Sequence, residues 1–546
     1  MELTHRRSWS WGLSLSLLMA AGCGPGQAAD QGDDEVGGDG RTLIMAWDPP
    51  QQPRADMIMV VDDSPSMRPH QNNLGANAGF FAEVVSIEDI EADVRVVVTT
   101  TSVPGPTCTG SRAHGGEPML DSCRSHLEDF VGVDEHGEYG GGSEDLSGVC
   151  EVYCDLDSID RVPSRGFEDD PSEALRPWFE APQNVFGGNL AADVPFEQAV
   201  TCALMQGISG CSFESPMEAA ARIVEQAHDP DDPLYGFRRE DAALLVAVFS
   251  DEDDCSHPDG SGTIFDPDGE RVFWPDGADE PLSAICFNAG HECQGDDCQV
   301  VDHDLSGAVT DDPAQAVLTP PSRLFDALQA AGEYDDEDWE PVVGVAGGFT
   351  NPGDVFYEHP APGSEYEDYG AAFGIGPVCL GVDSALAAPG GRLQAMTELV
   401  SPGNTFSICN NDWTPVFGAM VETLKVQLLP ICLDDACYAD LDPQTAVLEP
   451  DCVLERVDGE DLILEVPTCE RDDTGWVIDS ESHDYVIPEG ADQCWVWQTD
   501  AEAAEAQNRP AIECVEQGSP GEVKIARRAG TYPPHGYSWQ LRCRPC

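Results

Sequence analysis

Apolar residues along this chain form short unbroken runs, and amphipathic stretches lie between them. An unbroken apolar run is the pattern of a strand buried on both faces, as in a parallel sheet covered by helices. Strands are therefore expected at 57–61, 94–101, 243–249, 341–346 and 404–409, and helices at 67–85, 195–205, 217–228, 324–331 and 413–426. This alternation predicts an α/β fold with a doubly wound, mostly parallel sheet.

The first predicted strand ends in a run of oxygen-bearing residues. Pro65 cannot donate a backbone hydrogen bond, so the strand must end before it. Asp62, Ser64 and Ser66 then occupy alternate positions of a loop at the carboxyl end of a central strand, where open α/β sheets place their ligand sites. A carboxylate and two hydroxyls are hard ligands of the kind that Mg²⁺ prefers. A turn that caps the next helix is the alternative interpretation.

A second predicted strand, 243–249, also ends in acidic residues, with Asp251 soon after the last apolar position. Asp62-x-Ser64-x-Ser66 and this later Asp together resemble the metal-ion-dependent adhesion site (MIDAS) of von Willebrand factor type A (vWA) domains, in the form found in bacterial lipoproteins. The resemblance covers about residues 54–427 and implies a Rossmann-like sheet.

The resemblance also implies a set of ligands. Asp62, Ser64 and Ser66 would hold Mg²⁺ (or Ca²⁺ or Mn²⁺), and Asp251 would reach the ion through water. The family usually adds a Thr from a third loop, but this sequence has no Thr there. Ser212 and Glu214 are the two candidates for that position, and a Glu would make the ion less electrophilic. The last coordination position would accept an Asp or Glu side chain of a protein partner.

Two long insertions interrupt the predicted vWA domain, near 104–194 and 256–312. Insertions of this length are unusual unless they are functional or held by disulfides. In the second insertion, Asp302, Asp304 and Ser306 resemble the start of a calcium loop, but Pro313 stands where a bidentate Glu is needed. A solvated loop is the alternative interpretation.

The first 22 residues have the form of an export signal, with two arginines followed by an apolar stretch. The signal ends in Ala-Ala-Gly-Cys, which resembles a lipobox, so Cys23 is expected to carry a lipid anchor for the membrane. Gly24 follows, which by the sorting rule of such lipoproteins implies the outer membrane. Residues 23–53 are expected to be a flexible tether.

The cysteine content predicts disulfides, and the net charge restricts the class of partner. The 546 residues include 21 Cys, and an exported chain with twenty Cys besides Cys23 predicts a disulfide framework. Local pairs are expected at 150/154, 202/211, 293/298, 432/437 and 543/546, with zinc as the rival for the last pair. The net charge of −76, with only two Lys, makes nucleic acid and anionic lipid headgroups poor partners.

Residues 428–546 differ from the rest in their eight Cys and short alternating runs, which predict a small disulfide-rich β domain. The sequence does not indicate the role of this domain.

For the whole chain, the leading hypothesis is a non-enzymatic surface lipoprotein that captures a protein partner through the metal. One alternative is a metal-dependent hydrolase with Ser64 as nucleophile. Another is a passive envelope protein stabilised by calcium.

Overall fold

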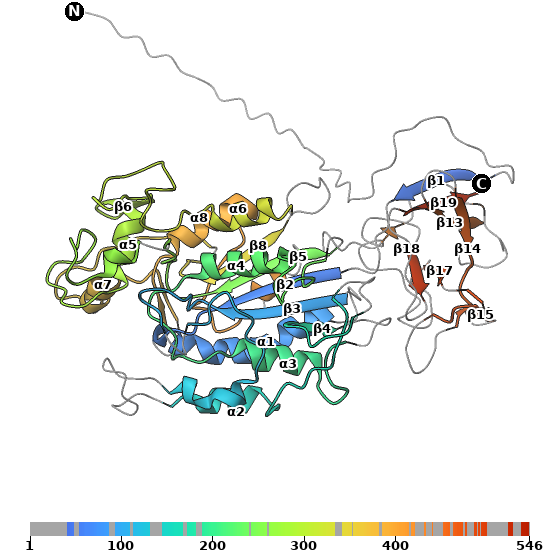
Figure 1. Ribbon diagram of the computed structural model, residues 1–546, viewed down its shortest axis with the longest axis horizontal. Coiled ribbons are helices and arrows are strands. Elements are labelled where there is room, and N and C mark those ends of the chain that lie inside the picture. The colour runs from blue at the N-terminus through green and yellow to red at the C-terminus, as the bar shows by residue number, and fades with distance from the viewer. Residues whose placement is uncertain are drawn as a thin grey trace, which may run out of the picture.

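The computed structural model (Figure 1) consists of a large α/β part and a smaller β module that includes the C-terminal residues. It describes residues 41–47, 54–86, 93–109, 113–131, 145–166, 172–181, 188–239, 242–258, 261–332, 341–351, 353–381, 385–413, 416–420, 431–432, 439, 451–458, 462–472, 475–477, 485–488, 490–491, 493–498, 522–527 and 537–544. The expected export signal and Cys23 lie outside these residues, as do 421–426 of the last predicted helix.

A six-stranded sheet forms the centre of the α/β part, in the order β11-β8-β5-β2-β3-β4. All neighbouring strands are parallel except β3 and β4, which are antiparallel. The strands are β2 (Arg54–Val61), β3 (Asp93–Thr100), β4 (Phe179–Ala181), β5 (Ala243–Phe249), β8 (Val342–Gly347) and β11 (Thr405–Ser407). Five of these strands confirm the sequence prediction, whereas β4 arises inside the first insertion and was not predicted.

Helices cover both faces of this sheet (Figure 1). One face is covered by α1 (Arg68–Ser86) and α3 (Phe196–Leu204), and the other by α4 (Pro216–His228), α6 (Arg323–Ala330) and α8 (Gly391–Val400). Along β2, Met57 and Met59 belong to the first core, while Ile58 and Val60 belong to the second. Burial on both faces explains why the strand sequences are apolar without alternation. Helix α8 was not predicted.

The order of the strands reverses between β2 and β5, which lie side by side in the sheet. From β2 the chain continues to β3 and β4 on one side, and it later returns to build β5, β8 and β11 on the other. A reversal of this kind leaves a crevice at the carboxyl ends of the two central strands. These are the strands that precede Asp62 and Asp251.

Disulfides hold the insertions in place, but most of the observed cysteine pairs differ from those expected from the spacing in the sequence. The observed pairs in the α/β part are Cys108–Cys211, Cys123–Cys150, Cys154–Cys202, Cys255–Cys286, Cys293–Cys298 and Cys379–Cys409. The local pair 293/298 is confirmed because β6 (His291–Gln294) and β7 (Asp297–Val300) form a hairpin. The pairs 150/154 and 202/211 are wrong, since folding brings more distant cysteines together.

The insertions also carry short elements that the sequence analysis did not predict. In the first insertion these are a 3-10 helix (Cys123–Phe130) and α2 (Ser147–Tyr153). In and after the second they are a 3-10 helix (Ser261–Phe265), α5 (Ala284–Gly290), α7 (Glu367–Phe373), β9 (Cys379–Leu380) and β10 (Leu386–Ala387). A further 3-10 turn, Pro65–Met67, joins β2 to α1.

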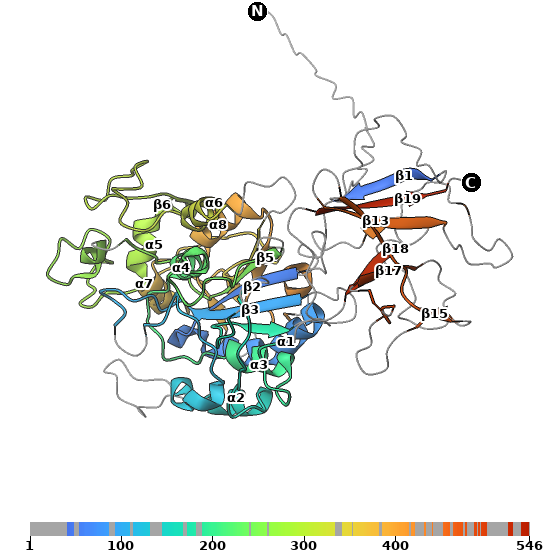
Figure 2. The same ribbon diagram turned by 45° about the vertical axis from the view of Figure 1, so that its right-hand side comes forward.

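The β module, seen from a second side in Figure 2, has a four-stranded sheet in the order β1-β19-β13-β14 and a three-stranded sheet in the order β12-β18-β17. Their strands are β1 (Thr42–Trp47), β12 (Ile431–Cys432), β13 (Cys452–Asp458), β14 (Leu462–Val466), β17 (Gln493–Gln498), β18 (Glu522–Arg527) and β19 (Tyr537–Cys543), beside a small β15 (Arg471–Asp472) and β16 (Gly475–Trp476) pair. Buried Trp495 and Trp539 belong to one core cluster with residues of both sheets.

Strand β1 corrects the expectation of a tether over 23–53. Residues 42–47 pair antiparallel with β19 and so belong to the same sheet as the C-terminal strand. The expected pair 543/546 is also wrong, because Cys543 is bonded to Cys452 on the neighbouring strand, and Cys469 is bonded to Cys494. This pairing removes the zinc alternative, since Cys543 has no thiolate to offer a metal.

No helix within the described ranges combines the length and apolar character that a membrane crossing requires.

Candidate cation site

Asp62 directly follows β2, at the carboxyl ends of the two central strands, and is fully buried. Its backbone N–H donates to the carbonyl of Phe249 at 2.9 Å, which joins the ends of the two strands. The N–H of Ser64 donates to Asp62 Oδ1 at 2.8 Å, and Ser250 Oγ donates to Asp62 Oδ2 at 2.6 Å. Both carboxylate oxygens are therefore held in place by residues of the two strand-end loops.

A chain of hydroxyls links this loop to the next acidic residue. Ser64 Oγ and Ser66 Oγ lie 2.7 Å apart, and Ser66 Oγ donates to Asp251 Oδ1 at 3.0 Å. Asp251 is 3 % exposed, although it follows a different strand. The structure thus brings together the four residues that the sequence analysis placed at strand ends: Asp62, Ser64, Ser66 and Asp251.

The two candidates from the third loop differ in where they lie. Glu214 is 1 % exposed, and its pKa is raised by burial and then by the charges of Glu252 and Asp62, which lie near it. Glu214 Oε1 is buried without a hydrogen-bond partner. Ser212 is exposed, and its carbonyl accepts a bond from Ser283 Oγ at 3.5 Å. Of the two, Glu214 is therefore the residue that the fold directs toward Asp62.

Glu252 belongs to the same cluster and was not among the predicted site residues. Glu252 is 6 % exposed, and its pKa responds to burial and then to the side chains of Glu214, Asp62, Ser283 and Ser66, which lie near it. Its N–H donates to Ser250 Oγ at 3.3 Å, the hydroxyl that also holds Asp62. The acidic run after strand 243–249 was the available signal, but sequence alone does not tell which of its side chains turns inward.

Burial and mutual repulsion keep the carboxyl groups of this cluster from ionising readily. Burial raises the pKa of Asp62, and burial together with the charges of Asp62 and Glu252 raises the pKa of Asp251 well above its usual value. Burial, then the charges of Glu252 and Asp62, likewise raises the pKa of Glu214. The pKa of Glu252 rises to about 7, mainly through burial. Such a cluster favours binding of a compensating positive charge.

The protein itself supplies little of that charge. Among the described residues, the ion pairs of these four acids are limited to His70 Nε2 and Asp251 Oδ2, at 3.9 Å. Burial lowers the pKa of His70, so its ring is neutral at physiological pH. Buried carboxylates, hydroxyls and an unpaired Glu214 oxygen form an all-oxygen donor set, which fits Mg²⁺, Mn²⁺ or Ca²⁺.

Asp63, the neighbour of Asp62, fastens the third loop to the site. Asp63 Oδ1 accepts a hydrogen bond from Ser102 Oγ at 2.7 Å, and its carbonyl accepts one from the N–H of Gly210 at 2.7 Å. Ser102 Oγ in turn accepts from the N–H of Cys211 at 2.9 Å. Burial raises the pKa of Asp63 to about 8. Its contacts are to the loops, so we assign it a positioning role.

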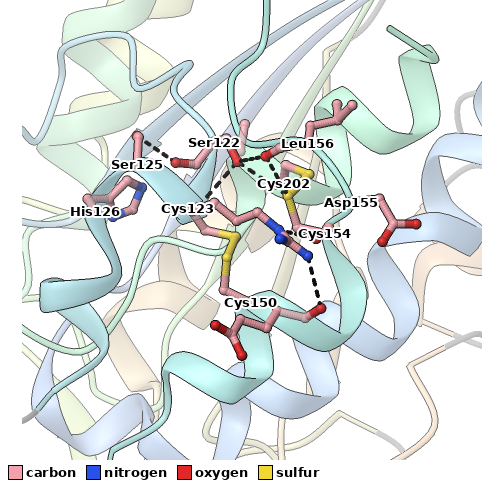
Figure 3. Close-up of a disulfide and its surroundings, with 12 residues drawn as sticks. Ser122, Cys123, Ser125, His126, Cys150, Cys154, Asp155, Leu156 and Cys202 are labelled. Carbon is pink, nitrogen blue, oxygen red and sulfur yellow. Dashed lines mark hydrogen bonds between the residues drawn. A yellow bond between two sulfur atoms is a disulfide. The ribbon is translucent and has the colours of Figure 1, made fainter.

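Two other groups of possible metal ligands lie outside this cluster. Three sulfurs, those of Cys123, Cys150 and Cys154, lie within 4.8 Å of one another (Figure 3), but each is in a disulfide and none is a free thiolate. In the second insertion, Asp304 Oδ1 accepts bonds from its own loop, from the N–H groups of Ser306 and Ala308 at 2.8 and 3.1 Å. One oxygen of Asp304 is therefore engaged within its own turn.

The fold and the crevice define a doubly wound α/β protein with a polar, acidic site at its switch point and a disulfide-containing β module. No protein-family model matches the sequence, and a comparison with curated proteins also finds no match.

Similar solved structures include pilus adhesins. Two crystal structures of SpaC from Lactobacillus rhamnosus GG, one of them in an open conformation, have TM-scores of 0.27, with 8 % and 9 % identity over 94 % and 91 % of this chain. RrgA from Streptococcus pneumoniae has a TM-score of 0.25 and 9 % identity over 92 % of this chain. The match covers 45 %, 39 % and 57 % of those chains, so this protein spans about half of their length. At these TM-scores the likeness carries no inference about ligands.

Proposed function

We propose that this protein is a cell-envelope binding protein with a vWA-type domain, which uses a divalent cation at a MIDAS-like site to capture a protein partner. The observation that carries the proposal is the chain of contacts from Asp62 through Ser64 and Ser66 to Asp251. It spans the carboxyl ends of β2 and β5, where the strand order reverses. That position and that set of oxygen donors are what the resemblance in the sequence implies.

Asp62, Ser64, Ser66 and Asp251 would hold the ion, with Glu214 rather than Ser212 as the contribution of the third loop. A bound Mg²⁺, Mn²⁺ or Ca²⁺ supplies a hard Lewis acid that accepts an oxygen ligand. The side chains of the chain itself fix the ion's surroundings: Ser250 and the Ser64 N–H orient Asp62, and Ser66 spans the distance to Asp251. The partner would contribute an Asp or Glu side chain.

The proposal is for binding without catalysis. A hydrolase with Ser64 as nucleophile needs a base beside that hydroxyl. Ser64 Oγ lies 2.7 Å from another hydroxyl, Ser66 Oγ, and also interacts with the Asp62 carboxylate, while the ring of His70 contacts the carbonyl of Leu386 at 3.2 Å. These contacts favour ion coordination over activation of Ser64.

The N-terminal sequence supports a location in the cell envelope. Residues 1–22 would direct export, and lipid on Cys23 would anchor the protein in the outer membrane of a Gram-negative cell envelope. Disulfides such as Cys108–Cys211 suit an oxidising compartment and support export.

The test combines cation binding with partner binding. Mn²⁺ binding is measured by electron paramagnetic resonance on the wild type, on Asp62→Ala and on the exposed control Asp268→Ala. Partner binding is measured on a panel of purified cell-surface and extracellular proteins, in Mg²⁺ and in EDTA. We expect Asp62→Ala and EDTA each to abolish both kinds of binding, and Asp268→Ala to change neither.

Two results would contradict the proposal in different ways. Absence of Mn²⁺ binding to the wild type would remove the cation site altogether. Cation binding that raises the melting temperature, with partner binding unchanged in EDTA, would leave only the passive, metal-stabilised envelope protein.

A further inference from the structure

A groove with a volume of about 790 Å³ lies beside the loops that follow β8 and β11. Its lining includes the side chains of Asn351, Leu380, Asn410, Asn411 and Asp412. The parallel pairing of the strands places these loops at the same end of the sheet as the candidate cation site. β11 is three strands away from β2, or about 14 Å at the usual spacing of strands, so the groove is a separate feature. Its volume is in the range of sites for small ligands.

The loop after β11 is held in one conformation by buried amides of α1. Asn73 Nδ2 and Asn77 Nδ2 donate to the carbonyls of Asn410 and Asn411, each at 3.4 Å. Asn77 Oδ1 accepts from the N–H of Trp413 at 3.2 Å, and Trp413 Nε1 donates to the carbonyl of Asn410 at 2.6 Å. These contacts use the backbone of residues 410 and 411 and leave their side chains for the groove. A loop ordered in advance loses little conformational entropy when a ligand binds.

A pair of amides joins the two loops across the groove. Asn351 Nδ2 donates to Asn410 Oδ1 at 3.0 Å, and Asn410 Nδ2 donates to Asn351 Oδ1 at 3.1 Å. A primary amide has two N–H donors and two acceptor lone pairs, so each of these side chains keeps one donor and one acceptor for a ligand. The exposed amide of Asn411 adds a third group of the same kind. The groove therefore presents donors and acceptors side by side, on amides fixed by each other.

This lining selects for a particular chemistry. Hydroxyl groups both donate and accept hydrogen bonds, so a ligand with several neighbouring hydroxyls matches an array of amides. Among the described residues that line the groove there is no basic side chain, while Asp412 is acidic and the net charge is −76, so an anionic ligand is disfavoured. Leu380 is 61 % exposed and offers an apolar contact for the C–H groups of a ring. The disulfide Cys379–Cys409 fixes Leu380 beside the amide loop.

We propose that this groove binds a neutral carbohydrate. The amides of Asn351, Asn410 and Asn411 would bind sugar hydroxyls, and Leu380 would pack against one face of a sugar ring. The inference goes beyond the proposed function, because the groove shares no residue with the candidate cation site and needs no metal. The protein would then have two separate binding positions at one end of its sheet, one for an acidic side chain and one for a neutral glycan.

The experiment uses the lipid-free chain of residues 24–546 on a glycan array. The array contains neutral oligosaccharides of glucose, galactose, mannose and N-acetylglucosamine, together with sialylated and sulfated oligosaccharides. We expect binding to neutral members, equal in Mg²⁺ and in EDTA. Isothermal titration with the neutral oligosaccharide that gives the strongest signal then compares the wild type with three variants.

Two of these variants remove an amide from the groove, and the third is a matched control. Asn411→Ala and Asn351→Ala are each expected to weaken binding about 5-fold or more, the effect of losing about one hydrogen bond. Asn72→Ala removes an exposed amide of α1 that contacts Tyr153 in α2, outside the groove, and should leave the affinity unchanged. The two groove positions are also exposed, so all three variants should keep the melting temperature of the wild type.

Four results would overturn this inference. They are a lack of binding to every neutral oligosaccharide, binding confined to sialylated or sulfated members, wild-type affinity in both Asn411→Ala and Asn351→Ala, and loss of sugar binding in EDTA or in Asp62→Ala. The last result would move the sugar to the cation site. The proposed function is tested by Mn²⁺ binding and by capture of a protein partner, so either proposal can fail while the other stands.

Discussion

Ser66 Oγ lies 3.0 Å from Asp251 Oδ1, although 185 positions separate these residues in the sequence. The contact exists because β2 and β5 are adjacent and parallel, so their carboxyl ends meet at one edge of the sheet. Ser66 also lies 2.7 Å from Ser64 Oγ. Its hydroxyl is therefore the link between the two loops of the candidate site.

Replacing Ser66 is expected to weaken cation binding without unfolding the protein. Ser66→Ala removes an oxygen donor and the bridge to Asp251, and loss of such a group typically lowers metal affinity about 10- to 100-fold. Since Ser66 is only half-buried, the melting temperature without cation should change little. Titration with Mn²⁺ and thermal denaturation measure the two quantities, and Ser306→Ala in the exposed Asp304 turn is the control. Unchanged affinity in Ser66→Ala would place the ion elsewhere.

A buried charge cluster at the opposite end of β2 leads to a prediction about pH. Asp56 is fully buried, and its Oδ1 accepts from Arg239 Nη2 at 2.7 Å, while Arg238 Nη1 lies 3.2 Å from its Oδ2. Burial acts to raise the pKa of Asp56, but the charges of Arg239, Arg238 and Arg95 outweigh it, so the pKa lies below its usual value. Asp56→Asn should cost about 3–5 kcal/mol at neutral pH, because buried arginines lose their partner.

The sign of the pH dependence follows from the lowered pKa. Above about pH 5 the Asp56 carboxylate is ionised in both the folded and the unfolded chain, so its stabilising effect is complete. As the pH falls through the lowered pKa of the folded state, the carboxylate is protonated and the effect is lost. Urea denaturation between pH 2.5 and 7 should show a difference in unfolding free energy between wild type and Asp56→Asn that is constant above about pH 5 and shrinks below it. A constant difference at all pH values would contradict this assignment.

The sheet could be predicted from the sequence because its central strands are continuous apolar runs. Residues 57–61 and 243–249 are apolar on both faces, and their burial in two separate cores is the physical cause of that pattern. Asp62 and Asp251 could be placed at one edge because parallel strands end together. The sequence did not indicate that Glu252 turns into the crevice, since it stands in an acidic run and only the backbone path after β5 decides which side chain is buried.

Contacts between distant segments could not be predicted from the sequence pattern. Spacing suggested that Cys150 pairs with Cys154, but α2 directs the two sulfurs to different partners, Cys123 and Cys202. Residues 42–47 are mostly apolar and had the composition of a strand. Their partner is the last strand of the chain, so composition alone could not distinguish a tether from an edge strand.

The close packing of Gly210 against Asp63 makes this glycine sensitive to substitution. A Cβ atom at residue 210 would lie 2.3 Å from Asp63 Oδ1 and 2.7 Å from its carbonyl oxygen, far inside contact distance. Gly210→Ala should therefore displace the third loop and cost about 1–3 kcal/mol. Gly148→Ala in α2 is the matched control, because a Cβ there meets nothing within 4 Å. Chemical denaturation compares the two, and equal stabilities would contradict the packing of Gly210 on Asp63.

The pairing of β1 with β19 predicts that residues 42–47 stabilise the far end of the chain. β1 is hydrogen-bonded along one edge of β19, whose Trp539 and Leu541 are fully buried in the module. A lipid-free chain that starts at residue 48 should lose about 2 kcal/mol or more of module stability compared with one that starts at residue 24, since each backbone hydrogen bond contributes about 1 kcal/mol.

In the shorter chain, hydrogen exchange should accelerate at the amides of β19 that face β1. The amides of β5, in the core of the α/β sheet, serve as the internal control and should exchange at the same rate in both chains. Equal protection of β19 in the two chains would mean that β1 does not pair with it in solution.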